Sequence, residues 1–210
     1  KRKILIILFS ASIYDTETQG IGYPFMDVPS IPPQLSGQIS LESYQQVVWS
    51  TLRILGEMYR FIPQDHLPNE WGTAANIPSG SRIALYIARV GQAFSIDYED
   101  LRENVYLTIN APHTGLLLSF RALEYRGVTG SSPVYSCSSC GRRHLHPSGN
   151  VCTRCYGTVV EDERRTASQL RERHYYTYRA LRNSASRLHC EELTGQTQDQ
   201  LQRQRHFRGL

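Results

Sequence analysis

Apolar side chains recur at three- and four-residue spacing through residues 41–62, which predicts the longest helix of the chain. Ser40 precedes this run as an N-cap, and Pro63 is expected to end the helix. The same periodicity predicts a second helix over 82–94, with Ser81 as its N-cap. The first half of the chain is therefore expected to build its core mainly from helices.

Two shorter helices are expected to follow. Asp97 opens a D-x-x-D pattern that resembles a capping box and predicts a helix over 98–105. Thr114 can cap a fourth helix over 115–125, and Gly127 is suited to end it. These elements fit a small helical or winged-helix-like region, in which the stripe of aromatic residues is interpreted as core.

The N-terminal end carries the apolar run ILIILF, and residues 3–13 are predicted to form a buried strand. Basic residues before the run and small residues after it also fit a secretory signal, an alternative that stays open beside the favoured strand. The run is too short to span a bilayer. Residues 15–39 are rich in Gly and Pro, which predicts a long loop.

The C-terminal end changes character and becomes rich in arginine. Residues 163–183 predict an Arg-rich helix, and the alternating run RLHCEEL at 187–193 predicts a strand. A polar turn at 194–197 separates this strand from a last helix at 198–208. The predicted order is thus a strand, a Thr-Gly turn and an Arg-bearing helix that ends in Phe-x-Gly.

Four of the five cysteines form the pattern C-x2-C-x11-C-x2-C, which is typical of a four-cysteine zinc ribbon. Gly141 and Gly157 follow the two pairs and are expected to help the backbone turn. Two disulfides in a secreted module are the competing interpretation. Cys190 is left over and is interpreted as a small buried residue. We expect one structural zinc ion bound by Cys137, Cys140, Cys152 and Cys155.

The segment between the two cysteine pairs is expected to form a basic hairpin end. His144 and His146 could each replace a cysteine ligand, but four thiolates already complete the shell, so both are interpreted as polar residues of the hairpin. Zinc ribbons often present such an end to nucleic acid or to a partner domain. Its candidate nucleic-acid-binding residues are Arg142, Arg143 and Arg154.

Charge is unevenly distributed along the chain. Residues 1–133 carry 10 basic and 12 acidic residues, residues 134–160 carry three arginines and no acid, and residues 161–210 carry 10 basic and 7 acidic residues. The positive charge is therefore concentrated in the last third, where contact with a polyanion is permitted but not required. An ordinary solvated helix face remains an equal alternative.

The string LHCEELTGQTQDQLQRQRHFRGL resembles the second RecA-like lobe of superfamily 2 helicases. Together with YY-x-Y and the four-cysteine ribbon, it is more narrowly similar to large helicases of bacterial anti-phage defence systems of the Druantia and DISARM types. The resemblance covers residues 134–210 and extends only vaguely over 1–133. It implies that Thr194, Gly195 and Gln196 lie near the nucleic-acid track.

The resemblance is incomplete, because the chain has no G-x-x-x-x-G-K-[ST] loop and no D-E-x-H box. ATP and Mg²⁺ are therefore expected only in a parent protein, and this segment alone is not expected to hydrolyse ATP. The fold class implied is α+β. It comprises a strand plus helical accessory region at 1–133, a zinc ribbon at 134–160 and a partial RecA-like lobe at 161–210.

The sequence is compatible with three functions to different degrees. The first is a segment of an ATP-dependent DNA helicase or translocase, with DNA and the remaining helicase domains as partners. The second is a protein-interaction module stapled by zinc. The third, an independent enzyme, is disfavoured because the chain offers no nucleophile–base pair. The start at Lys1 without an initiator Met and the end at Gly209-Leu210 both look like boundaries, so we expect a segment of a larger protein. We expect that protein to be cytoplasmic and to have no membrane partner.

Overall fold

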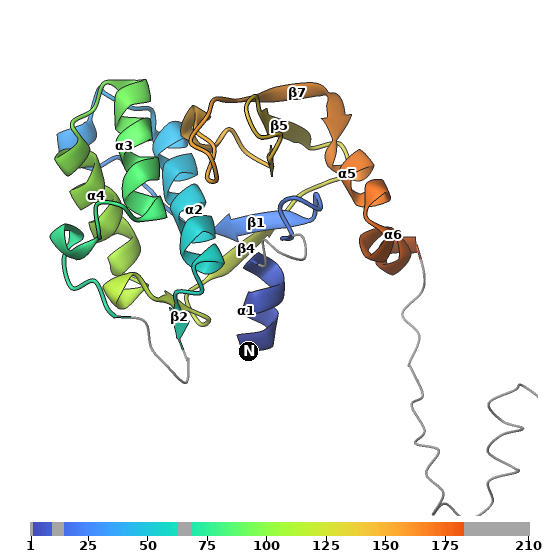
Figure 1. Cartoon of the computed structure of the whole chain (residues 1–210), viewed down its shortest axis with the longest axis horizontal. Helices are drawn as coiled ribbons and strands as arrows, with labels where there is room; N and C mark the ends of the chain where they lie inside the picture. The colour runs from blue at the N-terminus through green and yellow to red at the C-terminus, as the bar shows by residue number, and fades with distance from the viewer. Residues whose placement is uncertain (1, 10–14, 63–68, 183–210) are drawn as a thin grey trace, which may run out of the picture. The chain divides into compact units, whose positions relative to one another are not determined.

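The computed structural model describes residues 2–9, 15–62 and 69–182, and it has a mixed α+β fold. Residues 1–178 form one compact unit, which contains both the helices and the cysteine ribbon (Figure 1). A second unit comprises residues 179–210, of which only 179–182 are described. In the described part of the chain no helix is long and apolar enough to cross a membrane.

Three helices form the largest part of the core: α2 (Leu41–Glu57), α3 (Arg82–Phe94) and α4 (Tyr98–Asn110). They contact one another in pairs, as Figure 1 shows. In α2, 13 of the 17 residues are buried, so it is covered on nearly all sides and is the central helix. Its outer sides are covered by the ribbon and by a strand pair.

The helix starts follow the sequence prediction. The Ser40 hydroxyl accepts a hydrogen bond from the backbone N–H of Ser43 at 3.1 Å, and the Ser81 hydroxyl accepts one from Ala84 at 3.2 Å. Asp97 accepts from two backbone amides in the first turn of α4. These bonds satisfy amide groups that have no partner within the helix, so the three predicted N-caps are confirmed.

The predicted N-terminal strand at 3–13 is wrong, because the apolar run forms helix α1 (Arg2–Phe9). Leu5 and Phe9, four positions apart, are both buried on one side of this helix. The Phe9 ring lies against the backbone of Gly56 in α2, where an added Cβ would stand 2.2 Å from ring carbon atoms. A short apolar run fits either element, and here packing against α2 selects the helix.

The predicted helix at 115–125 is also wrong. Gly115 and Leu116 have positive φ values of 65° and 51°, which end the short turn η3 (Thr114–Leu116) before a helix can form. The chain continues through β3 (Leu118–Ser119), which pairs in parallel with β2 (Phe61–Ile62). Tyr59 has a positive φ of 55° and Phe61 and Ile62 form β2, so α2 ends at Glu57, earlier than the predicted residue 62.

The predicted loop at 15–39 contains a strand, β1 (Gly22–Phe25), which pairs antiparallel with β4 (Glu124–Gly127). This pair lies against α2 (Figure 1). The remaining short turns are η1 (Pro33–Leu35), η2 (Ala74–Asn76) and η4 (Ser148–Asn150).

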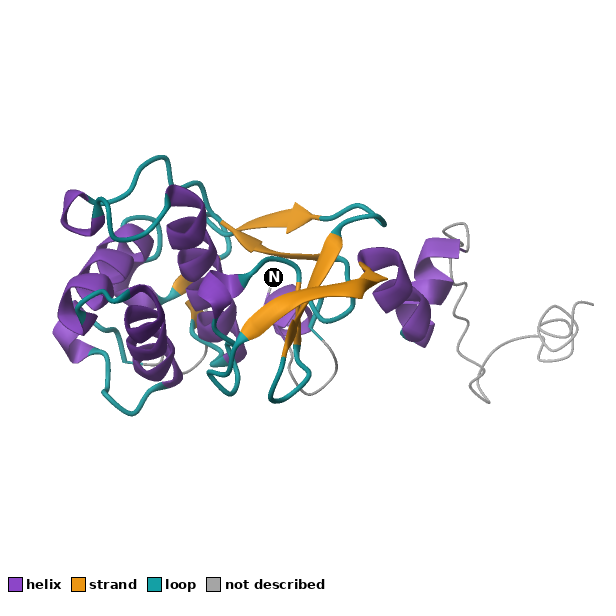
Figure 2. Ribbon diagram, turned by 90° about the horizontal axis from the view of Figure 1, so that it is seen from above, coloured by secondary structure: helices purple, strands orange, loops and turns teal. Residues whose placement is uncertain are grey.

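The ribbon forms a three-stranded antiparallel sheet in the order β6-β5-β7. Figure 2 draws all strands of the chain in orange. The strands of the ribbon are β5 (Pro133–Cys137), β6 (Arg143–His144) and β7 (Val159–Thr166). The turn η4 fixes this sheet to the helices, because the Ser148 hydroxyl lies 2.6 Å from that of Ser50, and the Tyr86 hydroxyl donates to the Ser148 carbonyl at 2.9 Å. The ribbon is therefore packed onto the helical core.

The Arg-rich helix predicted at 163–183 is divided in the structure. Its first residues belong to β7, and α5 (Ala167–Arg173) and α6 (Tyr175–Arg182) follow. Thr166 ends the strand and opens a capping box with Gln169, so the helix can begin only there. The strand at 187–193, the turn at 194–197 and the helix at 198–208 lie outside the described residues.

Candidate metal centre

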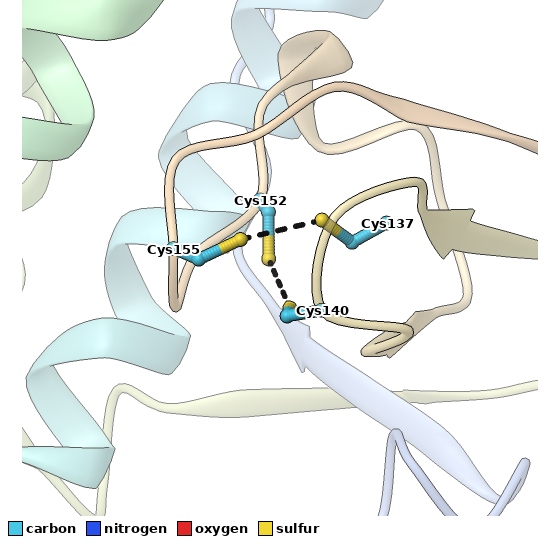
Figure 3. A group of neighbouring side chains, drawn as sticks. All are labelled: Cys137, Cys140, Cys152 and Cys155. Carbon is cyan, nitrogen blue, oxygen red and sulfur yellow. Dashed lines mark hydrogen bonds between the residues drawn. The ribbon is translucent and has the colours of Figure 1, made fainter.

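The four cysteine sulfur atoms converge on one point between the two turns of the ribbon (Figure 3). All four Sγ atoms lie within 4.8 Å of one another, with 3.4 Å between Cys137 and Cys155 and 3.7 Å between Cys140 and Cys152. A disulfide would bring two sulfurs to about 2.05 Å. A tetrahedral ion with metal–sulfur bonds near 2.3 Å separates its sulfurs by about 3.8 Å. The arrangement therefore fits a four-sulfur metal site.

The first turn, around Cys137, is closed by two backbone hydrogen bonds. The Cys137 N–H donates to the Arg142 carbonyl at 2.9 Å, and the Gly141 N–H donates to the Cys137 carbonyl at 3.0 Å. Gly141 has a φ of 69°, and a Cβ built on it meets nothing within 4 Å. Its requirement for glycine is thus conformational, as the sequence predicted.

The second turn repeats the first with a shift of 15 residues. The Cys152 N–H donates to the Gly157 carbonyl at 2.8 Å, and the Tyr156 N–H donates to the Cys152 carbonyl at 3.1 Å. The positive φ, 61°, falls on Tyr156 and not on the predicted glycine. Gly157 is needed for space, because a Cβ there would lie 2.5 Å from the Ser139 hydroxyl oxygen. It allows the two turns to approach each other.

The four thiols differ in their surroundings. Cys137 and Cys152 are buried, whereas Cys140 and Cys155 are exposed. Burial raises the pKa of the Cys152 thiol to about 12, and the neighbouring thiolates of Cys140 and Cys137 add to the rise. Thiolates this close together are held in the charged form by a divalent cation, which lowers the pKa of any thiol that binds it. Four protein sulfurs leave no position for substrate, so the site is suited to a structural ion.

The two histidines of the ribbon are buried, in contrast to the predicted polar hairpin end. His144 is 0 % exposed and His146 is 5 % exposed. Burial lowers the pKa of His146 to about 3 and that of His144 well below its ordinary value. The Nδ1 atom of His146 accepts a hydrogen bond from the Ser148 N–H at 3.1 Å. The His144 ring contacts Arg53 and the His146 ring packs edge-on against Trp49, so both rings belong to the contact between the ribbon and α2.

A buried ion-pair network lies beneath the ribbon, and sequence reasoning missed it. Arg53 of α2 is 1 % exposed and contacts Asp15 at 2.8 Å, Glu17 at 2.9 Å and Glu57 at 3.4 Å. Burial alone raises the pKa of Asp15, but Arg53 and Arg142 outweigh it and hold the pKa below its usual value. The ion pairs thus offset the cost of burying these charged side chains inside the fold.

Arg142, predicted to lie on the basic hairpin end, joins this network. Its guanidinium contacts Asp15 at 3.1 Å and also forms an ion pair with Glu57. Glu57 pairs with Arg82 of α3 as well, and Arg82 donates to the Thr153 carbonyl at 3.1 Å. Arg142 therefore binds the ribbon to the helices, and most of its charge is neutralised by carboxylates.

Arg143 and Arg154 differ from Arg142. The Arg143 guanidinium donates to two neutral oxygens, those of the Ser136 hydroxyl and the Gly141 carbonyl, at 2.9 and 2.8 Å. Arg154 is exposed. Neither arginine forms an ion pair with a carboxylate of the described residues. Both line a pocket of about 460 Å³ that also borders Cys140.

Comparison with known proteins adds no relative to this picture: no family model, curated protein or solved structure matches the chain. Thr194, Gly195 and Gln196, the remaining predicted nucleic-acid-binding residues, lie outside the described residues. The structure thus brings the four predicted cysteines together, and the three predicted arginines all line the pocket, although Arg142 is also part of the ion-pair network.

Proposed function

We propose that the chain binds one structural zinc ion through its four cysteines and belongs to an ATP-dependent DNA helicase or translocase of bacterial anti-phage defence. In this proposal the zinc ribbon and its arginines supply contacts to nucleic acid. The chemistry of ATP and Mg²⁺ is assigned to other parts of the parent protein. Thr194, Gly195 and Gln196 keep their proposed place near the nucleic-acid track.

Zinc is favoured by the donor set. Four thiolates in a tetrahedral arrangement select zinc or an iron–sulfur cluster among the common metals, and the two C-x2-C pairs are typical of zinc ribbons. The sulfur–sulfur distances suit a single ion. A structural ion of this kind contributes folding free energy to the ribbon, which has only a small apolar cluster of its own beside the cysteines.

The observation that carries the nucleic-acid proposal is the pair Arg143 and Arg154, whose charges are not neutralised by a described carboxylate. Arginine presents a planar fork of N–H donors that matches the oxygens of a phosphate. The fork of Arg143 is already held by two hydrogen bonds, on a ribbon that is fixed to a packed core, which reduces the entropy lost on association.

The second candidate is a protein-interaction module stapled by zinc. The ion pairs that Arg142 forms within the fold favour it. This arginine is bonded to Asp15 and Glu57, so part of the positive charge of residues 134–160 acts within the fold. On this alternative the ribbon presents a surface to a partner protein, and the zinc ion serves only to keep that surface folded.

The test is DNA binding by the zinc-loaded chain across a salt series. Zinc content is confirmed first, so that a failure to bind cannot be assigned to an unfolded ribbon. Binding to single-stranded DNA should weaken steeply with salt, because each neutralised phosphate contributes a slope of roughly −0.7 to log K against log salt. If no binding is found at low salt with zinc in place, the interaction module is the better account.

A further inference from the structure

We propose that the pocket beside Cys140 binds one phosphate group of a nucleic-acid strand, together with part of the attached sugar. This inference rests on the proposed nucleic-acid function and names the subsite at which it acts. Its arginines come from three segments: Arg82 begins α3, Arg142 and Arg143 follow the first cysteine turn, and Arg154 lies in the second.

The carboxylates of the pocket are already engaged from the protein side. Asp15 and Glu57 line it, but Asp15 is held by Arg53 and Arg142, and Glu57 by Arg53, Arg82 and Arg142. Glu17, the third acid of the buried network, contacts Arg53, so the three arginines at least match the acids in charge. The acids therefore leave little negative charge to repel an incoming anion.

Arg143 and Arg154 are the net positive charges of the pocket. The Arg143 guanidinium is held in place by the Ser136 hydroxyl and the Gly141 carbonyl, so its orientation is fixed without loss of charge. Arg154 is exposed and can turn towards a ligand. Arg82 adds a partly exposed guanidinium, with 33 % of its side chain accessible. A phosphate bound here replaces water with charge-assisted hydrogen bonds.

The negative charge of the metal centre limits the affinity of the pocket for phosphate. A divalent cation with four thiolates carries a formal charge of about −2, and Cys140 borders the pocket. Arg143 and Arg154 line the same pocket as Cys140. A phosphate competes with the thiolates for the same donors, so we expect moderate affinity and strong salt dependence.

The size of the pocket agrees with this ligand. Its volume of about 460 Å³ lies within the range of sites that bind small molecules. This volume exceeds that of a single phosphate group, which leaves room for the adjoining sugar. A base need not enter the pocket, so binding there is expected to be independent of sequence.

The experiment compares two double variants of the zinc-loaded chain. Arg143→Gln with Arg154→Gln removes both charges from the pocket. The matched control, Arg164→Gln with Arg173→Gln, removes two exposed charges from β7 and α5, outside the lining of this pocket. Affinity for a short single-stranded oligonucleotide is measured against salt for both, and inorganic phosphate is titrated separately while amide shifts are followed by NMR.

The pocket variant should lose about tenfold in DNA affinity, and its salt slope should be shallower by roughly 0.7, the value for one lost phosphate contact. The control should keep most of its affinity. Inorganic phosphate should shift the amides around Arg143 and Arg154 in the wild type but not in the pocket variant.

Four results would contradict the proposal or the function on which it rests. Equal losses in both variants would mean that general positive charge, and not the pocket, attracts DNA, and the proposed function would then survive without this subsite. Loss of zinc from the pocket variant would mean that the arginines serve as counter-charges for the thiolates. If the wild-type protein does not bind DNA but phosphate still shifts the pocket amides, the nucleic-acid function alone is contradicted. If phosphate does not shift these amides, the subsite is contradicted.

Discussion

Arg142, two residues after the cysteine Cys140, forms an ion pair with Glu57 in the last turn of α2. The two residues are 85 positions apart in the chain, and their side chains are 7 % and 0 % exposed. The same guanidinium reaches Asp15 at 3.1 Å. One arginine therefore connects the first cysteine turn with two separate parts of the core, so that folding of the ribbon and packing of α2 are coupled.

Replacing Arg142 with Ala should lower the free energy of unfolding by about 3 kcal/mol, because it leaves buried carboxylates with fewer partners. Arg53 and Arg82 remain beside Glu57, which keeps the loss from being larger. The measurement is chemical denaturation of the zinc-saturated protein. Arg143→Ala is the matched control: its bonds go to neutral oxygens, and the expected loss is about 1 kcal/mol. Similar losses for both variants would contradict the coupling.

The double variant Cys137→Ser with Cys152→Ser should lose its zinc, because it removes one ligand from each C-x2-C pair. Metal content after gel filtration measures this directly. A structural zinc ion supplies roughly 10 kcal/mol or more of folding free energy, so the ribbon should also unfold. Cys190→Ser, outside the four-cysteine cluster, should keep one zinc per chain. Unchanged metal content in the double variant would show that the four sulfurs do not bind the ion together.

Gly141→Ala should weaken zinc binding about fivefold, since a φ of 69° costs an L-residue about 1 kcal/mol. No steric term adds to this, because a Cβ at this position meets nothing within 4 Å. Gly141→Asn should lose less, as Asn adopts this conformation more readily. Competition with a chelator gives the affinities. An Asn variant as weak as the Ala variant would contradict a backbone origin.

The sequence was sufficient for features that depend on neighbouring residues. The caps at Ser40, Ser81 and Asp97 bond within three positions of themselves, so local pattern determines them. The cysteine cluster was equally predictable, because each C-x2-C pair closes its own turn. In the second turn the positive φ falls on Tyr156, while Gly157 is needed for space beside Ser139. This could not be predicted, because it depends on how closely the second turn approaches Ser139.

Features decided by distant contacts could not be predicted. Arg53 and Glu57 are four positions apart on one helix and resemble an ordinary surface pair. Only the fold brings Asp15, Glu17 and Arg142 over them and excludes water. The position of Arg53 and Glu57 in the apolar second half of α2 is the one sign of a buried ion pair, because that part of the helix is buried on all sides. Helix α1 is a similar case, because its apolar run acquires a preferred form only by packing on α2.

Glu17 should make stability depend on pH in a direction opposite to most paired carboxylates. Burial raises its pKa from 4.5 to about 7, although Arg53 and the Leu145 N–H favour the charged form. A carboxyl group with a raised pKa contributes its full stability below its unfolded value, near 4.5, and that contribution is lost as pH rises through about 7. The other charged or titratable groups facing it are Asp15, Arg142, His144 and His146.

Glu17→Gln removes this titration and retains an acceptor oxygen for the Leu145 N–H. The unfolding free energy of the variant minus that of the wild type should therefore increase by about 2 kcal/mol between roughly pH 5.5 and pH 8. Denaturation is measured at several pH values with zinc in excess for both proteins, so that proton release from the thiols cancels in the difference. The buried histidines, with lowered pKa values, lose stability as pH falls below about 6.5, and this contribution cancels too. A difference that stays constant with pH, or that decreases as pH rises, would mean that Glu17 is charged throughout this range, as the ion pair with Arg53 alone would dictate.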